Sequence, residues 1–509
     1  MRLGWLFYVA LFIMTVGLSV WHNTFPINYH PDESSKIAQL IGQTERNFRH
    51  PPLLLDATLV VNKLRAADHS IAELSISGRW VSALAAGITV IILTGLAHYL
   101  AGGLAALLVA VMVGASPSLI LYAHYMKEDT LLVMGGSGVI AASVLYWLKP
   151  HWQSAMLLAV ACVIASLTKY VALIFWGPAV AVLLIQCRQA KWGDVKRIVL
   201  GFLCGLIISF GLLGYHVWSN WSGVHSGMTY EYRHVTTGHW GLVTSFFNRL
   251  TFYFFDIPWQ LMYWPILPGV IGVAYFVCCS QRRIRIAMRI SLVVFCLYLF
   301  VILLARFASS RYALLLTVMI SWFAAMFIGY MIRHVTARST RQSLAIVVVS
   351  LVTLVSVYGA YRVIYQFKHD GRQQMIAWVR THMTTDHAMV CDSYCAIPDP
   401  GFKAYVQLYG SVPPRVRVGR FAASLGSLDS IRKAGVTHVA VCDYSYNRFL
   451  LDEGVLARTD ANAKSIEKNR HNQPFYLQLF NEGDLVWQHK PRYHLPGFTS
   501  PTLAIYRIQ

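Results

Sequence analysis

The stretch "DTLLVMGGSGVIAASVLYWL", residues 129–148, indicates what kind of protein this is. Its one charged side chain is Asp129 at the start, and Lys149 follows its last residue. A run of about 20 predominantly apolar residues is long enough for a helix to cross the hydrocarbon core of a bilayer. We therefore expect a membrane-spanning helix here, with an acidic residue at one end and a basic residue at the other.

Apolar runs of this kind recur along the first three-quarters of the chain. Hydrophobic residues make up 56% of the sequence and charged residues only 13%, whereas soluble domains are roughly 25% charged. The mean hydropathy is +0.49. The pattern predicts about eleven spanning helices, over residues 3–21, 78–98, 103–121, 129–148, 153–168, 170–187, 198–218, 259–280, 290–305, 311–332 and 344–366.

The basic residues predict the orientation of these helices. If the N-terminus lies inside, the cytoplasmic loops are 149–152, 187–197, 281–289 and 333–343, and all four contain Lys or Arg. Short loops rich in Lys and Arg stay on the cytoplasmic side. They also hold much of the formal charge of +20, so this charge gives no reason to expect a nucleic-acid partner.

The acidic residues of the first 366 positions gather on the other side. In this topology only Asp194 is cytoplasmic, and the other ten acidic residues lie in the outer segments 22–77, 122–129 and 219–258. Asp and Glu have little influence on topology, so their placement is not a consequence of membrane sorting. We therefore expect any chemistry on the outer face.

The composition changes after residue 366, where helical and strand patterns alternate. Strands are expected in "HAMVCDS", "VTHVAVCDY", "DLVWQH" and "TLAIYRI", and helices in "GRQQMIAWVRTHM", "SLDSIRKAG" and "FYLQLFNEG". The expected fold is thus an α-helical polytopic membrane domain, residues 1–366, followed by a small extracytoplasmic α/β domain, residues 367–509. Cys391 and Cys395 either form a disulfide there or remain free and buried.

The first outer loop contains the stretch "NYHPDESSK", residues 28–36, with the adjacent carboxylates Asp32 and Glu33. One interpretation is catalytic: a carboxylate partly desolvated beside the bilayer has a raised pKa and can act as a general base. The other is structural: both residues cap the helix that follows and interact with its dipole. The spacing does not decide between them.

Further stretches matter because they occur in a recognisable order. "HPPL" begins at His50, and in "SPSLILYAHYMKEDTLLVM" (116–134) Asp129 opens the next helix. "LTKY" (167–170), "TYEYRHVTTGHWG" (229–241), "RFASSRYALLL" (306–316) and the closing "FYLQLFNEGDLVWQHKP" (475–491) follow. Together with the Asp-Glu pair, this series resembles the GT-C superfamily of polytopic glycosyltransferases, which includes protein O-mannosyltransferases and lipid A aminoarabinose transferases. Each motif is weak by itself, but the series covers nearly the whole chain.

The resemblance implies a membrane glycosyltransferase that takes a sugar from a polyprenyl-phosphate donor. The acceptor, a lipid, a glycan or a protein, would be modified on the outer face in a single displacement with inversion. Asp32 would be the general base, and Glu33 would orient His30, Lys36 or the backbone. Glu128 and Asp129 would order the loop or hold a divalent cation, although the sequence does not settle metal use. Donor or sugar contacts would come from His50, Lys169, Glu231, His234, His239 and Arg311.

Two other classes of protein share some of these features. A transporter also has many spans, but its intramembrane acids lie near the midplane, usually between repeated halves, and no repeat is visible here. A scaffold or sensor would explain the exported domain but not the charged first loop. We therefore expect a glycosyltransferase, with a transporter as the alternative, in a bacterial inner membrane with its site on the periplasmic face.

The topology makes a direct prediction. A reporter that is active only outside the cytoplasm should be active when fused after Gln509 and silent when fused after Arg341, because the two sites lie on opposite sides of the membrane. Measuring reporter activity in both fusions checks this. The reverse pattern would place Asp32 in the cytoplasm and remove the basis for an outer-face site.

Overall fold

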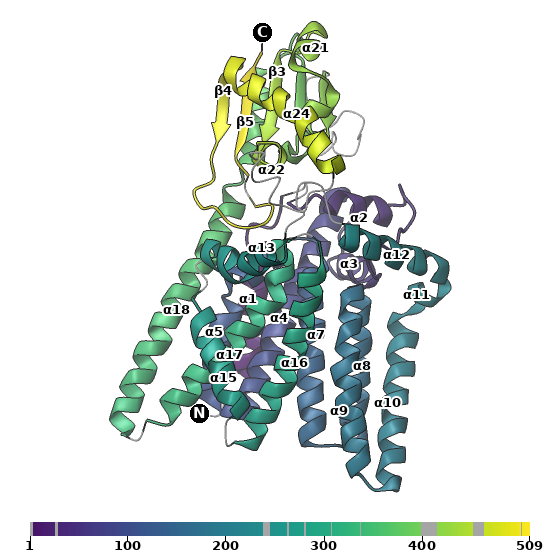
Figure 1. Cartoon of the computed structure of the whole chain (residues 1–509), viewed down its shortest axis with the longest axis vertical. Coiled ribbons are helices and arrows are strands. Elements are labelled where there is room, and N and C mark those ends of the chain that lie inside the picture. The colour runs from purple at the N-terminus through teal and green to yellow at the C-terminus, as the bar shows by residue number, and fades with distance from the viewer. Residues whose placement is uncertain are drawn as a thin grey trace.

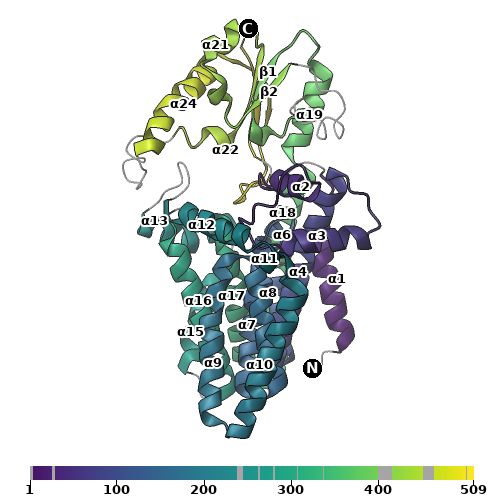
Figure 2. The same ribbon diagram turned by 90° about the vertical axis from the view of Figure 1, so that its right-hand side faces the viewer.

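The computed structural model describes residues 4–25, 29–237, 245–261, 264–278, 281–306, 308–335, 337–398, 415–450, 463–499 and 501–508. It has a bundle of long helices with a smaller sheet-containing domain stacked on one end (Figure 1). Shorter helices lie between the two parts, at the same end of the bundle (Figures 1 and 2).

Each predicted spanning run falls on a helix or on two consecutive helices. The helices are α1 (Trp5–Val20), α4 (Ile71–Ala101), α5 (Gly103–Gly114), α6 (Pro117–Ala123), α7 (Asp129–Leu148), α8 (Trp152–Thr168), η1 (Tyr170–Phe175), α9 (Trp176–Gln189), α10 (Trp192–Leu213), α15 (Ile266–Cys278), α16 (Arg282–Leu304), η3 (Ser310–Ala313), α17 (Leu314–Arg333) and α18 (Arg338–Lys368).

Helix length and composition give a smaller number of spans than the eleven predicted. Seven spans of the described chain are long and apolar enough to cross a membrane, or eight if α5 and α6, bent by 49°, form one span. The other three, α1, α8 and α15, are apolar but shorter. The predicted polytopic helical fold is confirmed, and the count of eleven stays a prediction.

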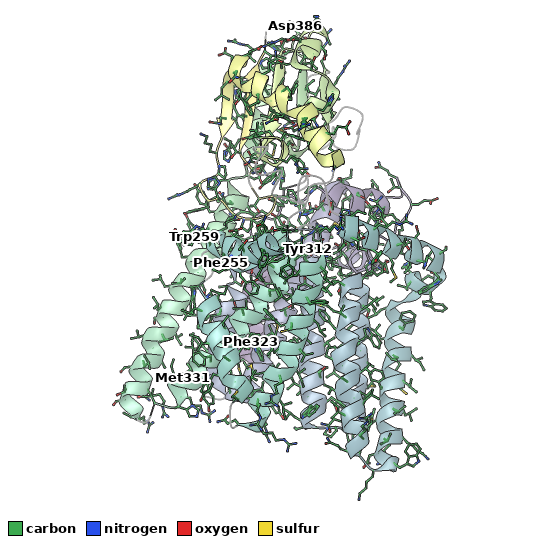
Figure 3. The ribbon with its side chains drawn as sticks, in the orientation of Figure 1. Phe255, Trp259, Tyr312, Phe323, Met331 and Asp386 are labelled. Atoms are coloured by element: carbon green, nitrogen blue, oxygen red, sulfur yellow. The ribbon has the colours of Figure 1, made fainter. Side chains whose placement is uncertain are left out.

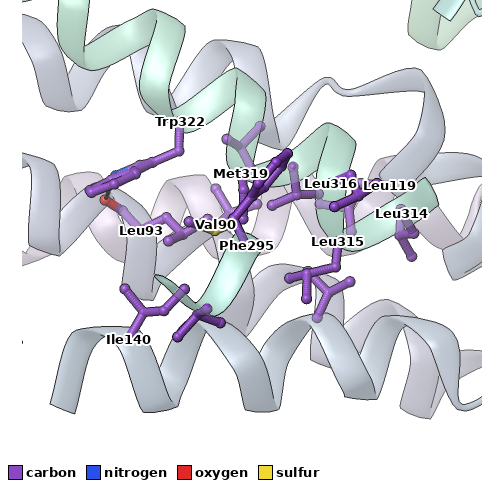
Figure 4. Packing of buried hydrophobic residues seen from close by; sticks show 14 of the residues in the cluster. Val90, Leu93, Leu119, Ile140, Phe295, Leu314, Leu315, Leu316, Met319 and Trp322 are labelled. Carbon is purple, nitrogen blue, oxygen red and sulfur yellow. Dashed lines mark hydrogen bonds between the residues drawn. The ribbon is translucent and has the colours of Figure 1, made fainter. Parts of the chain in front are cut away.

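The centre of the bundle is built around α17. Trp322 is fully buried, and its indole N–H donates to the Leu93 carbonyl of α4 at 3.3 Å. Figure 4 shows α17 side chains packed among residues of α4, α7 and α16. Small residues let helices approach closely: a Cβ on Gly329 would lie 2.7 Å from the Ala105 Cα. Close contacts of this kind are typical of helix packing in membranes.

The described parts of the loops predicted to be outside lie at one end of the bundle, and those of the basic loops lie at the other (Figure 1). The first loop forms α2 (Glu33–Leu40) and α3 (Leu53–Leu64). The segment after α10 forms α11 (Tyr215–Ser219), α12 (Trp221–Thr237), α13 (Phe246–Thr251), η2 (Phe252–Asp256) and α14 (Ile257–Gln260). Which end faces the outside stays a prediction.

The tail contains a five-stranded sheet in the order β2-β1-β3-β5-β4. Strands β1, β2 and β3 are parallel to one another, and β5 is antiparallel to both of its neighbours, β3 and β4. The strands are β1 (Met389–Asp392), β2 (Val416–Gly419), β3 (His438–Cys442), β4 (Asp484–His489) and β5 (Leu503–Arg507). Figure 2 shows the sheet between α24 (Ala463–Glu482) and α19 (Gly371–His382).

Most of the tail could be predicted from its pattern. Four of the five strands and the helices α19 and α21 (Leu428–Lys433) are as expected. The helix expected from Phe475 is the second half of α24, which begins at Ala463, and the short edge strand β2 was missed. Gly435 has a φ of +77°, which suits the residue just after the end of α21. Cys391 and Cys395 are buried, free thiols.

Candidate functional site

The two carboxylates of "NYHPDESSK" point in different directions. Glu33 is fully buried, and its Oε2 lies 2.7 Å from Nη2 of Arg79 on α4. Its Oε1 accepts the backbone N–H of Met126 at 2.9 Å. The other side of the Arg79 guanidinium donates to the Phe25 carbonyl. Glu33 therefore fastens the first loop to α4 and to the segment before α7, and no substrate can reach it.

The Asp32 carboxylate is the accessible one, with 47% of its side chain exposed. It occupies the N-cap position of α2, but its side chain makes no capping hydrogen bond, so the capping part of the structural interpretation does not hold for Asp32. Its Oδ2 forms a close ion pair with Lys127 Nζ and lies 3.5 Å from Arg311 Nη1. The Asp32 backbone N–H donates to His30 Nδ1 at 3.2 Å.

The expected rise in the pKa of Asp32 is wrong for this structure. Desolvation in the cleft acts to raise that pKa, but the positive charges of Lys127 and Arg311 outweigh it and hold the pKa of Asp32 well below its usual range. Burial also lowers the pKa of His30 well below its usual value, so this imidazole is neutral. Asp32 is therefore ionised at neutral pH, and its basicity is limited while Lys127 stays bound to it.

The remaining acidic residues near Asp32 are each paired with a lysine. Lys36 forms a close ion pair with Glu128, and its ammonium also donates to the Met126 carbonyl at 3.2 Å. Lys169 Nζ lies 2.8 Å from Asp129 Oδ1. Burial lowers the pKa of Lys36 to about 8, which leaves it mostly protonated at neutral pH.

These ion pairs do not balance. The carboxylates of Asp32, Glu128 and Asp129 are shared among three lysines and one arginine, so these seven side chains carry one positive charge in excess. Glu231 also interacts with Lys169, Arg311 and Lys127, but burial raises its pKa, which favours its neutral form. A net positive charge in a partly desolvated site favours binding of an anion. We call this group of residues the charged cluster: Asp32, Glu128, Asp129, Lys36, Lys127, Lys169 and Arg311.

A groove of about 290 Å³ leads away from the charged cluster between η1, α12 and α16. Its polar lining includes Lys169, Glu231 and Tyr312, and Lys169 Nζ lies 5.0 Å from the centre of the Tyr312 ring. Burial raises the pKa of Glu231. The rest of the lining is mainly apolar: Val171, Leu173, Ile174, Met228, Val235, Val301, Ile302 and Ala305. We call it the apolar groove.

The predicted histidines lie in different places. His50 lines the apolar groove, and burial lowers its pKa to about 3, so it is neutral. His234, on α12, stacks on Tyr230 with ring centres 6.0 Å apart, and burial lowers its pKa as well. His239 lies outside the described residues. A neutral imidazole can donate or accept one hydrogen bond at each nitrogen but adds no charge.

The predicted metal ligands do not make a metal site by themselves. In the described part of the chain, no three His, Cys, Asp or Glu side chains are arranged to hold a metal ion. Glu128 and one oxygen of Asp129 are bound to lysines, and only Asp129 Oδ2 is buried without a partner. The residues present therefore fit a network of lysine-carboxylate pairs better than a divalent cation.

Two residues of the site were missed by reading the sequence. Lys127 stands directly before Glu128 in the quoted stretch "SPSLILYAHYMKEDTLLVM" but was not singled out. Arg79 lies at the start of a predicted spanning run, and a charged residue in such a run usually has a partner or a function. The charge of Arg79 within an apolar run could therefore have been noticed in the sequence, but its pairing with Glu33 could not.

The tail contacts the first loop through the segment between β4 and β5. The Phe498 ring packs edge-on against His30, with centres 4.7 Å apart, and stacks on Tyr394 of the tail at 5.7 Å. The Phe498 N–H donates to the Tyr125 hydroxyl at 3.2 Å, and this hydroxyl also bonds the Thr499 hydroxyl at 2.6 Å. The tail thus holds His30, which accepts the Asp32 backbone N–H.

Comparisons with known proteins agree with the predicted resemblance. Residues 50–215 match the model of the family described as dolichyl-phosphate-mannose-protein mannosyltransferase. No curated protein sequence matches the chain.

Two solved structures show the fold. ArnT from Cupriavidus metallidurans, bound to undecaprenyl phosphate, is 13% identical, with a TM-score of 0.54 over 98% of this chain and 97% of its own. The archaeal oligosaccharyltransferase AglB from Archaeoglobus fulgidus is 10% identical, with a TM-score of 0.50 over 89% of this chain and 72% of its own. Family match and fold together confirm the predicted resemblance.

The contact between Phe498 and His30 predicts a positioning effect. If Asp32 is the general base that the resemblance implies, Phe498→Ala should lower turnover on the order of tenfold to 100-fold, because Asp32 loses the support of His30. The Michaelis constant for the donor should stay within about twofold of wild type, and Phe498→Tyr should restore most of the turnover. Steady-state kinetics of the purified variants checks both.

A tail ring that does not touch the first loop provides the control. Phe480 packs on Tyr446 and Tyr506 within the tail, so Phe480→Ala should affect stability more than turnover. Equal losses of turnover in Phe498→Ala and Phe480→Ala would assign the effect to the tail's stability and not to the position of Asp32.

Proposed function

We propose that this chain is a membrane glycosyltransferase of the GT-C superfamily, and that it transfers a sugar from a polyprenyl-phosphate donor to an acceptor on the outer face, with inversion at the anomeric carbon. One observation carries the proposal. An accessible, ionised carboxylate, Asp32, lies between Lys127 and Arg311, in a cluster with one excess positive charge whose Lys169 also lines the apolar groove.

The donor's chemistry suits this arrangement. A sugar joined to a polyprenol through phosphate is a phosphodiester, which carries one negative charge and a long apolar chain. The charge matches the excess of the charged cluster, and the apolar groove suits the first isoprene units. Lys169 belongs to both and would contact the phosphate. The likeness to ArnT, which binds undecaprenyl phosphate, supports this class of donor.

The reaction needs one proton transfer. The acceptor hydroxyl attacks the anomeric carbon from the face opposite the phosphate, the carbon–oxygen bond to the phosphate breaks, and the phosphate leaves with the electron pair. Asp32 accepts the hydroxyl proton. The leaving phosphate gains negative charge, and Lys127, Lys169 and Arg311 stabilise it as that charge develops.

Binding of the donor would also raise the low basicity of Asp32. When a phosphate engages Lys127 and Arg311, part of their charge is neutralised by the new anion, so less of it acts on Asp32. The pKa of Asp32 then rises towards the range in which a carboxylate is an effective base. In this account the base becomes effective only when the donor is bound.

The other acidic residues have supporting roles. Glu33 fixes the loop through Arg79, while Glu128 and Asp129 hold Lys36 and Lys169 at the donor phosphate's depth. His50 and Glu231 line the apolar groove near Lys169 and would hydrogen-bond the sugar or the phosphate. His234 and His239 stay candidates for the same role.

Asp32→Asn tests the assignment of the base. The amide cannot accept the hydroxyl proton, so turnover should fall on the order of 10²- to 10⁴-fold, with folding and donor binding little changed. Transfer from a purified polyprenyl-phosphate sugar to the native envelope acceptor fraction is the measurement. A well-folded variant with near-normal turnover would reject Asp32 as the base.

Two variants serve as controls for Asp32→Asn. Asp68 is an exposed acid of the same loop that accepts the Ser70 N–H, and Asp68→Asn should leave turnover unchanged. Glu33→Gln should instead lower the melting temperature, because it leaves Arg79 buried without its charged partner, at about 3–5 kcal/mol. A large loss of turnover in Asp68→Asn would show that loop charge in general, not the base, is responsible.

Lys169→Gln tests the donor assignment. Loss of the cation should raise the Michaelis constant for the lipid-linked donor roughly tenfold and lower turnover less, because the phosphate is bound in the ground state too. The double variant with Asp129→Asn removes the carboxylate left unpaired, so it should regain stability without regaining donor affinity. Sugar transfer from a nucleotide sugar alone would contradict the proposed donor class.

A further inference from the structure

A second groove, of about 790 Å³, lies beside the outer end of α18. It shares no lining residue with the apolar groove. Figure 3 shows two of its side chains, Phe255 and Trp259, at about the height of Tyr312 in the candidate site. We call it the aromatic groove, and its lining is Phe254, Phe255, Pro258, Trp259, Gln260, Trp264, Ile266, Arg362, Arg492, Tyr493 and His494.

Two arginines of the aromatic groove face the same ring. The guanidinium carbons of Arg362 and Arg492 lie 5.1 and 5.5 Å from the centre of Tyr493. None of the lining residues is acidic, and neither arginine forms an ion pair with a described carboxylate. Two like charges held around one ring repel each other, and an anion bound between them would relieve this repulsion.

Arg362 is not a side chain that merely extends to water. Long basic side chains near the end of a spanning helix commonly reach outwards to the membrane surface. Arg362 is instead buried to 9% exposure, lies against Tyr493 and donates to the Gln260 carbonyl at 3.4 Å. The fold thus directs this charge into the groove.

The mouth of the aromatic groove is apolar and open. Trp259 is 85% exposed and Phe255 is 69% exposed. Most of the apolar stretch of the neighbouring α18 is also not buried inside the protein. Exposed aromatic residues at the end of a membrane bundle lie at the level of the lipid headgroups. A ligand here would meet apolar contacts on the bilayer side and positive charge on the protein side.

We infer that the aromatic groove binds an anionic phospholipid of the bilayer, with its phosphate between Arg362 and Arg492 and its acyl chains along Phe255 and Trp259. The two arginines carry opposite charge to the headgroup, and the exposed rings match the chains. The site is separate from the donor site and does not depend on the proposed reaction. Because Arg492 and Tyr493 belong to the same β4–β5 segment as Phe498, the bound lipid would also hold that segment on α18.

Native mass spectrometry of the full chain from nanodiscs tests this inference. The nanodiscs contain equal amounts of phosphatidylglycerol and phosphatidylcholine with the same acyl chains. Wild type should retain phosphatidylglycerol in preference to phosphatidylcholine. The double variant Arg362→Gln/Arg492→Gln should reduce this preference roughly 10- to 30-fold, because each basic residue contributes about a factor of five at an anionic surface.

Three further variants keep the result interpretable. Arg362→Lys/Arg492→Lys retains both charges and should retain the preference, whereas Trp259→Ala should weaken binding of both lipids. Arg46 lies at the same end of the bundle but is paired with Asp56 at 2.7 Å, so Arg46→Gln should not change the preference. If Arg362→Gln does not fold, Arg492→Gln can be tested alone, because Arg492 is exposed and its replacement should not disturb folding. This single variant should also reduce the preference for phosphatidylglycerol.

Either of two outcomes would overturn the inference. One is equal retention of both lipids by wild type, which would make the groove a general apolar surface. The other is an unchanged preference for phosphatidylglycerol in the double variant, which would place the anionic site elsewhere.

Discussion

The buried ion pair between Glu33 and Arg79 is the contact on which the arrangement of the site depends. Burying two charges is costly, and a pair is retained only where its geometry and its further hydrogen bonds are good. Here Glu33 also accepts the Met126 N–H, and Arg79 also donates to the Phe25 carbonyl. These bonds join the first loop to α4 and to the segment before α7. Because Asp32 precedes Glu33 directly, fixing one carboxylate inwards leaves the other in the accessible cleft.

The charged cluster gives this fixed loop the positive charge on which the proposed donor site depends. Lysines that would be costly to bury alone are held by carboxylates, and the cluster keeps one positive charge beyond that pairing. Lys127 and Arg311 hold the pKa of Asp32 below its usual range, and the positive charge of the cluster supports the proposed binding of a phosphodiester. The tail adds a third constraint through Phe498 and His30, so that Asp32 is supported from the helical bundle and from the tail.

Local pattern predicted much of the fold but less of the site. The helices of the bundle and four strands of the tail follow from apolar runs and alternation, because hydrophobic periodicity is set by neighbours in the sequence. The edge strand β2 is as short as β1, but an exposed arginine, Arg417, interrupts its apolar residues, whereas all of β1 is buried. The pKa of Asp32 was expected to rise because burial was considered alone. The direction of the pKa shift depends on Lys127 and Arg311, which lie 95 and 279 positions after Asp32 in the sequence. Lys127 adjoins a predicted acid, yet only the tertiary fold shows that it contacts Asp32.

The most direct test of this account is the pH dependence of kcat/KM in wild type and in Lys127→Gln. This parameter reports ionisations of the free enzyme. In wild type the acidic limb should lie below the ordinary carboxyl range, because Lys127 holds the pKa of Asp32 down. Removing that charge should move the limb to higher pH while lowering the pH-independent rate. An acidic limb at the same pH in both proteins would contradict the claim that an ionised Asp32, controlled by Lys127, is the catalytic base.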